Sequence, residues 1–104
     1  MISDEQIESF AARIMDTVSP LKIVLFGSYA TGDATEDSDV DILLVCHSDK
    51  PKHRRVQEIR RALRPLPFPV DFVVYTPEEI RRYEAEEGTF VHHVLTNGKV
   101  IHAA

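Results

Sequence analysis

The chain has 104 residues, of which 43% are apolar and 28% charged, a composition typical of one ordinary globular domain. Its formal net charge of −5 argues against general affinity for nucleic-acid backbones or anionic membranes, so direct nucleic-acid binding is not expected. The single cysteine, Cys46, excludes an internal disulfide and a Cys-rich zinc site. No apolar run approaches the ~20 residues of a membrane span, and the N-terminus lacks the form of a secretory signal. We therefore expect a cytoplasmic protein with no membrane attachment.

The first half of the chain predicts one amphipathic helix followed by two buried strands. Ser3 and Gln6 form a capping-box pattern, and apolar residues then recur at helical spacing until Pro20 ends the helix. The apolar run 21–26 predicts a strand, and the run 39–46 predicts a second one. A Gly-Ser turn, a single helical turn and a polar loop connect these two strands.

The second half begins with a predicted helix over 54–64, and a Pro-rich connector leads from it to a predicted strand over 70–75. Thr76 and Glu79 form another capping box at the start of a further helical segment. Gly88 is expected to divide that segment into two helices, before a helix stop and a short final strand.

This order of elements predicts the α/β class: a single domain over residues 1–104, in which helices flank a small mixed β-sheet. Charge is distributed unevenly along it. Five of the seventeen acids lie between Asp33 and Asp41, and seven of the twelve Lys and Arg lie between Lys50 and Arg64. The basic run fits a solvated helix face as well as it fits a surface facing a partner or a phosphate.

Three aspartates stand where predicted strands begin. Residues two apart in a strand share a face, so Asp39 and Asp41 project together, opposite the apolar side chains between them. Asp71 lies near the start of the 70–75 strand, and all three carboxylates converge if the two strands are neighbours. Taken singly, each also fits a turn or strand-edge acid. Taken together, their charges repel unless a cation lies between them, and hard oxygen ligands suit Mg²⁺ or Mn²⁺.

Upstream of these acids, Gly27 and Ser28 follow the first strand. Gly27 allows a close backbone approach, and Ser28 offers a hydroxyl at the start of a short helix whose N–H groups can hold an anion. A lone Gly-Ser after a strand is most often a simple turn. Here the Gly-Ser pair lies at a fixed offset from Asp39 and Asp41, and this combination indicates a phosphate site.

The stretch GSYATGDATEDSDVD, from Gly27 to Asp41, resembles the G-S-x10-D-x-D signature of the nucleotidyltransferase superfamily that includes DNA polymerase β. The stretch PVDFVV around Asp71 resembles the strand that carries the third aspartate of that family. The resemblance covers the chain nearly end to end. In its brevity the chain is similar to minimal nucleotidyltransferases, including the MntA-type antitoxins that pair with HEPN-domain toxins.

The resemblance implies a nucleotidyltransferase fold and a metal-dependent transfer of AMP from ATP to a hydroxyl group. Asp39 and Asp41 would bind two Mg²⁺ ions, with Mn²⁺ as a possible substitute, and Asp71 would share one ion and help to activate the hydroxyl. Gly27 and Ser28 would hold the terminal phosphates of ATP. The similarity to MntA-type antitoxins implies a HEPN toxin as the partner, with a tyrosine as the acceptor.

One position departs from the family, which often reads G-S-x-A-R-G and here has Thr31 in place of the arginine. A cation near the triphosphate is thereby lost, which puts the catalytic rate in doubt more than the fold. The alternative is a non-catalytic module of the same fold that masks its partner. Aminoglycoside nucleotidylation is a third possibility, which the short chain disfavours.

Other polar residues are not expected to carry chemistry. Adjacent residues diverge by about 100° on a helix, so His92 and His93 would chelate a single metal poorly. Cys46 is expected to be a small core residue, and Asp37 a turn residue in the loop before the second strand.

Overall fold

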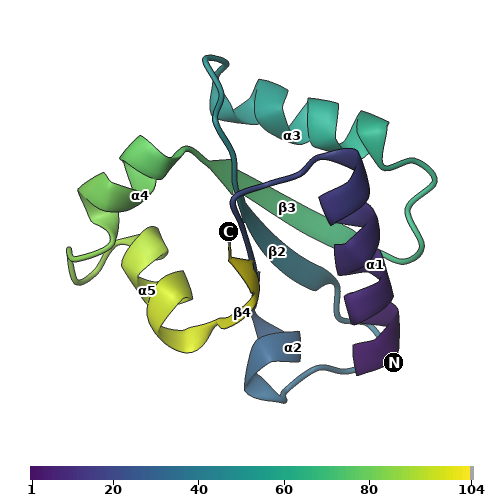
Figure 1. Ribbon diagram of the computed structural model, residues 1–104. Helices are drawn as coiled ribbons and strands as arrows, with labels where there is room; N and C mark the ends of the chain where they lie inside the picture. The colour runs from purple at the N-terminus through teal and green to yellow at the C-terminus, as the bar shows by residue number, and fades with distance from the viewer. Residues whose placement is uncertain (104) are drawn as a thin grey trace.

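One mixed sheet forms the centre of the molecule in the computed structural model, which describes residues 1–103 (Figure 1). From edge to edge its strands are β3 (Val70–Tyr75), β2 (Val40–Val45), β1 (Lys22–Phe26) and β4 (Lys99–Ala103). β1 pairs antiparallel with both β2 and β4, whereas β2 and β3 run parallel. The mixed α/β sheet predicted from the sequence is therefore confirmed.

Helices cover both faces of this sheet (Figure 1). The first and third helices pack on one face, the fourth and fifth on the other, and the second is a single turn directly after β1. No helix within residues 1–103 is long and apolar enough to cross a membrane. The helices are α1 (Asp4–Thr17), α2 (Ser28–Thr31), α3 (Lys52–Ala62), α4 (Pro77–Tyr83) and α5 (Phe90–Asn97).

The predicted helix starts are present. Ser3 caps α1 and Thr76 caps α4, each in a complete capping box in which side chain and backbone bond reciprocally. Gly88, at φ 87°, separates α4 from α5 as expected. Some boundaries differ by two residues: α3 begins and ends two residues earlier than the sequence pattern indicated, and α1 ends at Thr17, short of Pro20.

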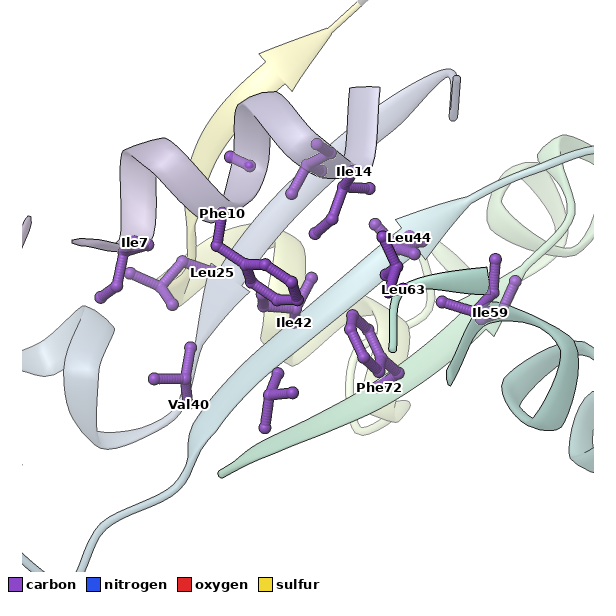
Figure 2. Packing of buried hydrophobic residues seen from close by; sticks show 14 residues of the cluster. Ile7, Phe10, Ile14, Leu25, Val40, Ile42, Leu44, Ile59, Leu63 and Phe72 are labelled. Atoms are coloured by element: carbon purple, nitrogen blue, oxygen red, sulfur yellow. The ribbon is translucent and has the colours of Figure 1, made fainter. Parts of the chain in front are cut away.

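The larger core lies between the sheet and the pair α1 and α3 (Figure 2). Ile42 and Leu44 of β2 project into it, and Phe10 of α1 packs against Phe72 of β3 with 6.1 Å between ring centroids. On the opposite face, Leu43 and Val45 of β2 pack under α4 and α5. β2 is thus buried on both faces except at Asp41. Asp41 lies on the same face as Leu43 and Val45, before the part of that face that α4 and α5 cover.

Arginines of α3 close the outer edge of β3. Arg60 donates a hydrogen bond to the carbonyl oxygen of Val70 at 2.7 Å, and Arg55 donates to that of Val74 at 3.2 Å. Edge strands expose unpaired backbone groups that invite pairing with other chains, so these bonds protect the edge. Two members of the basic run therefore have a structural role that the sequence pattern did not indicate.

Arg55 also links α3 to α4. Its guanidinium donates to the Glu79 carboxylate at 2.7 Å, and Glu79 in turn accepts from the Thr76 N–H at 2.8 Å in the capping box. The two side chains are only 10% and 26% exposed, so little water competes with the pair. One side chain thus ties together the β3 edge, α3 and the start of α4.

The Glu79→Gln substitution is expected to lower the free energy of unfolding at pH 7 by about 1–3 kcal/mol, because it removes a charge-assisted hydrogen bond from a shielded site. Chemical denaturation measures the loss. The matched control is Glu58→Gln, because Glu58 pairs with Lys50 in an exposed position, 44% and 47% exposed, and should cost less than about 1 kcal/mol. Equal losses in the two variants would contradict this account.

The loss in free energy of unfolding caused by Glu79→Gln should also depend on pH. Burial raises the pKa of Glu79, but the hydrogen bonds from Arg55 and the Thr76 N–H outweigh it and leave that pKa lowered. A lowered pKa stabilises the fold above the ordinary glutamate pKa, and the contribution is lost as pH falls through the folded-state value. The difference between wild type and Glu79→Gln should therefore shrink in acid.

Candidate active site

Asp41 and Asp71 are register partners on neighbouring parallel strands, β2 and β3. Neighbouring strands lie about 4.8 Å apart, and register partners project from the same face of the sheet. The sequence pattern required these strands to be neighbours for the carboxylates to converge, and the sheet order places them so. Asp39 lies one residue before β2, on the strand parity of Asp41.

The three carboxylates form one electrostatic cluster. Burial raises the pKa of Asp41, and the charges of Asp71 and Asp39 raise it further. Asp41 is half-buried, whereas Asp39 and Asp71 are exposed. An ionised Asp41 is therefore held beside two like charges with limited solvent screening, an arrangement that a bound cation would relieve.

Gly27 lies directly against this cluster. Its backbone has φ 72° and ψ −154°, a conformation available essentially to glycine alone. A Cβ atom at this position would stand 2.2 Å from Oδ2 of Asp41. Ser28 follows as the first residue of α2, so the structure brings the Gly-Ser pair and the aspartates to one place.

Thr31, at the position where the family often has arginine, turns back into its own loop. Its hydroxyl donates to Oδ2 of Asp33 at 2.9 Å and extends no charge over the cluster. Asp37 lies in an exposed turn in which its N–H donates to the Thr35 hydroxyl at 3.3 Å. The expectation that Asp37 is a turn residue is confirmed.

A hollow of about 600 Å³ opens beside Asp39, within the roughly 300–1,000 Å³ range of ligand-binding clefts. The start of α1, the loop before β2 and the Pro-rich connector surround it, with Tyr29, Ser38 and Phe68 among its lining residues. Of the three candidate carboxylates, Asp39 is the one that lines it.

Sequence reasoning did not single out Phe26, which is the β1 neighbour of Asp41 in the register. The sequence shows that Phe26 immediately precedes Gly27. That Phe26 lies beside Asp41 follows only from the antiparallel pairing of β1 with β2. His92 bonds to the carbonyl oxygen of Glu84, and His93 contacts the side chain of Asn97, so the two histidines have separate partners.

Cys46 was expected in the core and is instead half-buried, packing against the larger cluster just past the end of β2. Burial raises the pKa of its thiol, while the Arg55 charge opposes that rise. A raised pKa keeps the sulfur protonated at neutral pH, and a thiol is a poor nucleophile and metal ligand.

The donor set of the cluster suits a hard divalent cation, since carboxylate oxygens are the ligands that Mg²⁺ and Mn²⁺ prefer. The repulsion that raises the pKa of Asp41 would be relieved by such an ion, and the missing side chain of Gly27 is what allows the Asp41 carboxylate its position. Among residues 1–103, no three His, Cys, Asp or Glu side chains already stand in a metal-binding group. Asp39, Asp41 and Asp71 offer the right kind of ligand atom, but their side chains are not gathered in ligating geometry in this structure.

The fold and this arrangement define a class of protein. The sequence profile of the nucleotidyltransferase domain matches residues 7–94, most of the chain, so the chain belongs to the nucleotidyltransferase domain family. The matched segment contains the Gly-Ser pair and all three aspartates.

Two relatives agree with this assignment. A crystal structure described as "a putative nucleotidyltransferase from Sulfolobus solfataricus" superimposes with a TM-score of 0.57 at 25% identity, over 73% of this chain and 68% of that one. A curated protein named "Putative protein adenylyltransferase MJ0604", from Methanocaldococcus jannaschii, is 75% identical over 24 residues. That match spans 23% of this chain and 24% of the relative, about a quarter of each.

The Gly27→Ala substitution is expected to displace the Asp41 carboxylate, because the new methyl group would overlap Oδ2. The unfavourable φ should add about 1–3 kcal/mol of destabilisation. Gly32→Ala is the matched control, since Gly32 has φ 85° and open space around its Cβ position. A carboxyl NMR signal of Asp41 that moves in the first variant and not in the second supports the contact; no shift in either excludes it.

The Asp41→Asn substitution should leave the metal-free fold at least as stable as wild type at pH 7. The raised pKa means that ionised Asp41 opposes folding at neutral pH, and that wild type gains stability as pH falls through that pKa. The two proteins should therefore converge below the ordinary aspartate pKa of about 3.9. Thermal unfolding in EDTA measures this, with Asp37→Asn as the exposed control. A clear loss of stability in Asp41→Asn would instead show a structural role.

Proposed function

We propose that this protein transfers AMP from ATP to a hydroxyl group of a partner protein, with a tyrosine as the acceptor. The observation that carries the proposal is the shared register of Asp41 and Asp71, with Asp39 beside them and Gly27 against Asp41. Membership of the nucleotidyltransferase family supports nucleotidyl transfer as the reaction. The name of the curated relative supports a protein as the acceptor.

In the proposed step, the acceptor oxygen bonds to the α-phosphorus of ATP as the bond from that phosphorus to the bridging oxygen breaks. Pyrophosphate leaves with the bonding electron pair. The acceptor proton passes to the Asp71 carboxylate, which is exposed to the approaching hydroxyl, and then to solvent. Gly27 lies against Asp41 and Ser28 follows it as the first residue of α2, and the pair would hold the departing phosphates.

Asp39, Asp41 and Asp71 would hold the Mg²⁺ or Mn²⁺ ions. Bound divalent ions would supply charge neutralisation for the attacking and leaving oxygens. The chain itself contributes the orientation of these ligands. Parallel pairing of β2 with β3 sets Asp41 beside Asp71, and Gly27, which has no side chain, leaves space for the Asp41 carboxylate.

The acceptor is proposed to come from a second protein. The hollow beside Asp39 is open to the surface and large enough for a side chain with its flanking backbone. The likeness to MntA-type antitoxins makes a HEPN-domain toxin the proposed partner, whose tyrosine would be modified and its toxicity silenced. The cytoplasm is the proposed location of this pair.

A second candidate function is masking of the same partner without chemistry. It is favoured by Thr31, which bonds to Asp33 and places no cation near the triphosphate position. Masking does not require three converging carboxylates, whose mutual repulsion works against the fold, and we therefore favour catalysis.

The test is incubation of the protein and Mg²⁺ with α-labelled ATP and the HEPN toxin. Label should appear on the toxin, and Asp41→Ala or Asp71→Ala should reduce its rate of appearance at least about 100-fold, as loss of a group that stabilises transition-state charge does. Asp49→Ala is the matched control, an exposed acid in the loop after the other end of β2, and should transfer at the wild-type rate.

Three results separate the alternatives. Transfer that survives Asp41→Ala would contradict the assignment of the aspartates. Label from γ-labelled ATP on the toxin would indicate phosphoryl transfer in place of nucleotidyl transfer. Neutralisation of the toxin by Asp41→Ala, without transfer by wild type, would establish masking.

A further inference from the structure

Three aromatic rings gather on the sheet face that carries Asp41 and Asp71. The Phe26 and Phe90 rings meet edge to face with 5.5 Å between centroids. The Phe90 and Tyr75 rings are nearly parallel, at 26° and 6.4 Å. Phe90, the first residue of α5, therefore bridges β1 and β3 across the sheet.

The aromatic group is continuous with the carboxylates. Phe26 is the register partner of Asp41 across β1 and β2, and directly opposite residues share a face. Tyr75 lies on the same face of β3 as Asp71, four residues further on, which is about 13 Å along the strand. Val73 lies between them and is half-exposed. The face thus begins with charged oxygens and continues as an apolar, aromatic surface.

Phe90 remains open to solvent, with 44% of its surface exposed. Its backbone position is fixed, since the Thr89 hydroxyl caps α5 by accepting from the His92 N–H and donates to the carbonyl oxygen of Tyr83 at 3.0 Å. A single exposed ring is ordinary, but this one is grouped with the rings of Phe26 and Tyr75 on one face of the sheet. The helix start thus fixes the backbone of Phe90, and part of its ring faces solvent.

A hollow of about 190 Å³ lies beside the rings. It is smaller than the roughly 300–1,000 Å³ of sites that enclose a whole drug-sized ligand, and so suits a single planar ring system. The ammonium group of Lys52 stands at its rim, 4.3 Å from the centroid of Tyr75, and adds hydrogen-bond donors. Its lining residues are Lys52, Tyr75, Tyr83, Thr89, Phe90 and Val91.

We propose that Phe90 and Tyr75 form a stacking subsite for the base of the nucleotide whose phosphates lie at Gly27 and the aspartates. This inference rests on the proposed function and adds to it the residues that hold the base. Bases stack on aromatic side chains through their flat faces, which favours binding with little discrimination among bases. Lys52 supplies donors to ring nitrogens or carbonyl oxygens at the edge of the base.

The test compares two ligands in the presence of Mg²⁺: ATP, which has a base, and inorganic tripolyphosphate, which has none. Phe90→Ala should weaken ATP binding about tenfold and leave tripolyphosphate binding unchanged. Phe90→Tyr keeps a ring and should bind ATP as wild type does. Val100→Ala, at another exposed apolar position, 54% exposed on β4, should alter neither affinity.

Several outcomes would overturn the inference. Equal weakening of both ligands in Phe90→Ala would show that the ring only supports the fold. Unchanged ATP affinity, with slower labelling of the partner, would assign the rings to the acceptor. If wild type binds tripolyphosphate as tightly as ATP, the base subsite is refuted but the proposed function is not. Failure of wild type to bind either ligand would refute the proposed function as well.

Discussion

The parallel pairing of β2 with β3 is the constraint on which the candidate site depends. Its register sets Asp41 opposite Asp71, and the same register sets Ile42 opposite Phe72 in the larger core. Because side chains alternate between faces, a slip of one residue would bury a carboxylate and expose the apolar row. Burial of the apolar side chains therefore enforces the alignment of the acids. The acids gain no stability from their proximity, since it raises the pKa of Asp41.

The strand that carries Asp71 lies at the edge of the sheet, which leaves that carboxylate accessible but also exposes a row of backbone groups. Arg55 and Arg60 bind two of the outward carbonyls, and Arg55 also joins the capping box of α4 through Glu79. The exposed edge is thereby protected by side chains and not by another strand, so access to the site is kept. α4 and α5 cover the same face further along, where Phe90 ends the open region.

Much of this was predictable from the sequence because the signals were local. Capping boxes at Ser3 and Thr76, the alternation around Asp41 and the break at Gly88 each depend on neighbours a few residues away, and each is present. What the sequence could not provide depends on long-range pairing. The contact of Gly27 with Asp41, the place of Phe26 beside it and the binding of β3 carbonyls by Arg55 all require the sheet order, which no local pattern specifies.

The central claim is that Asp39, Asp41 and Asp71 form a divalent-metal site at the start of β2 and β3, with the nucleotide phosphates beside Gly27. The most direct measurement is a crystal structure of the protein with Mn²⁺ and a non-hydrolysable ATP analogue, in which anomalous scattering locates the manganese. We predict Mn²⁺ bound to carboxylate oxygens of Asp39 and Asp41, with phosphate oxygens completing its coordination. Mn²⁺ and analogue bound elsewhere, with these three carboxylates free, would contradict the account.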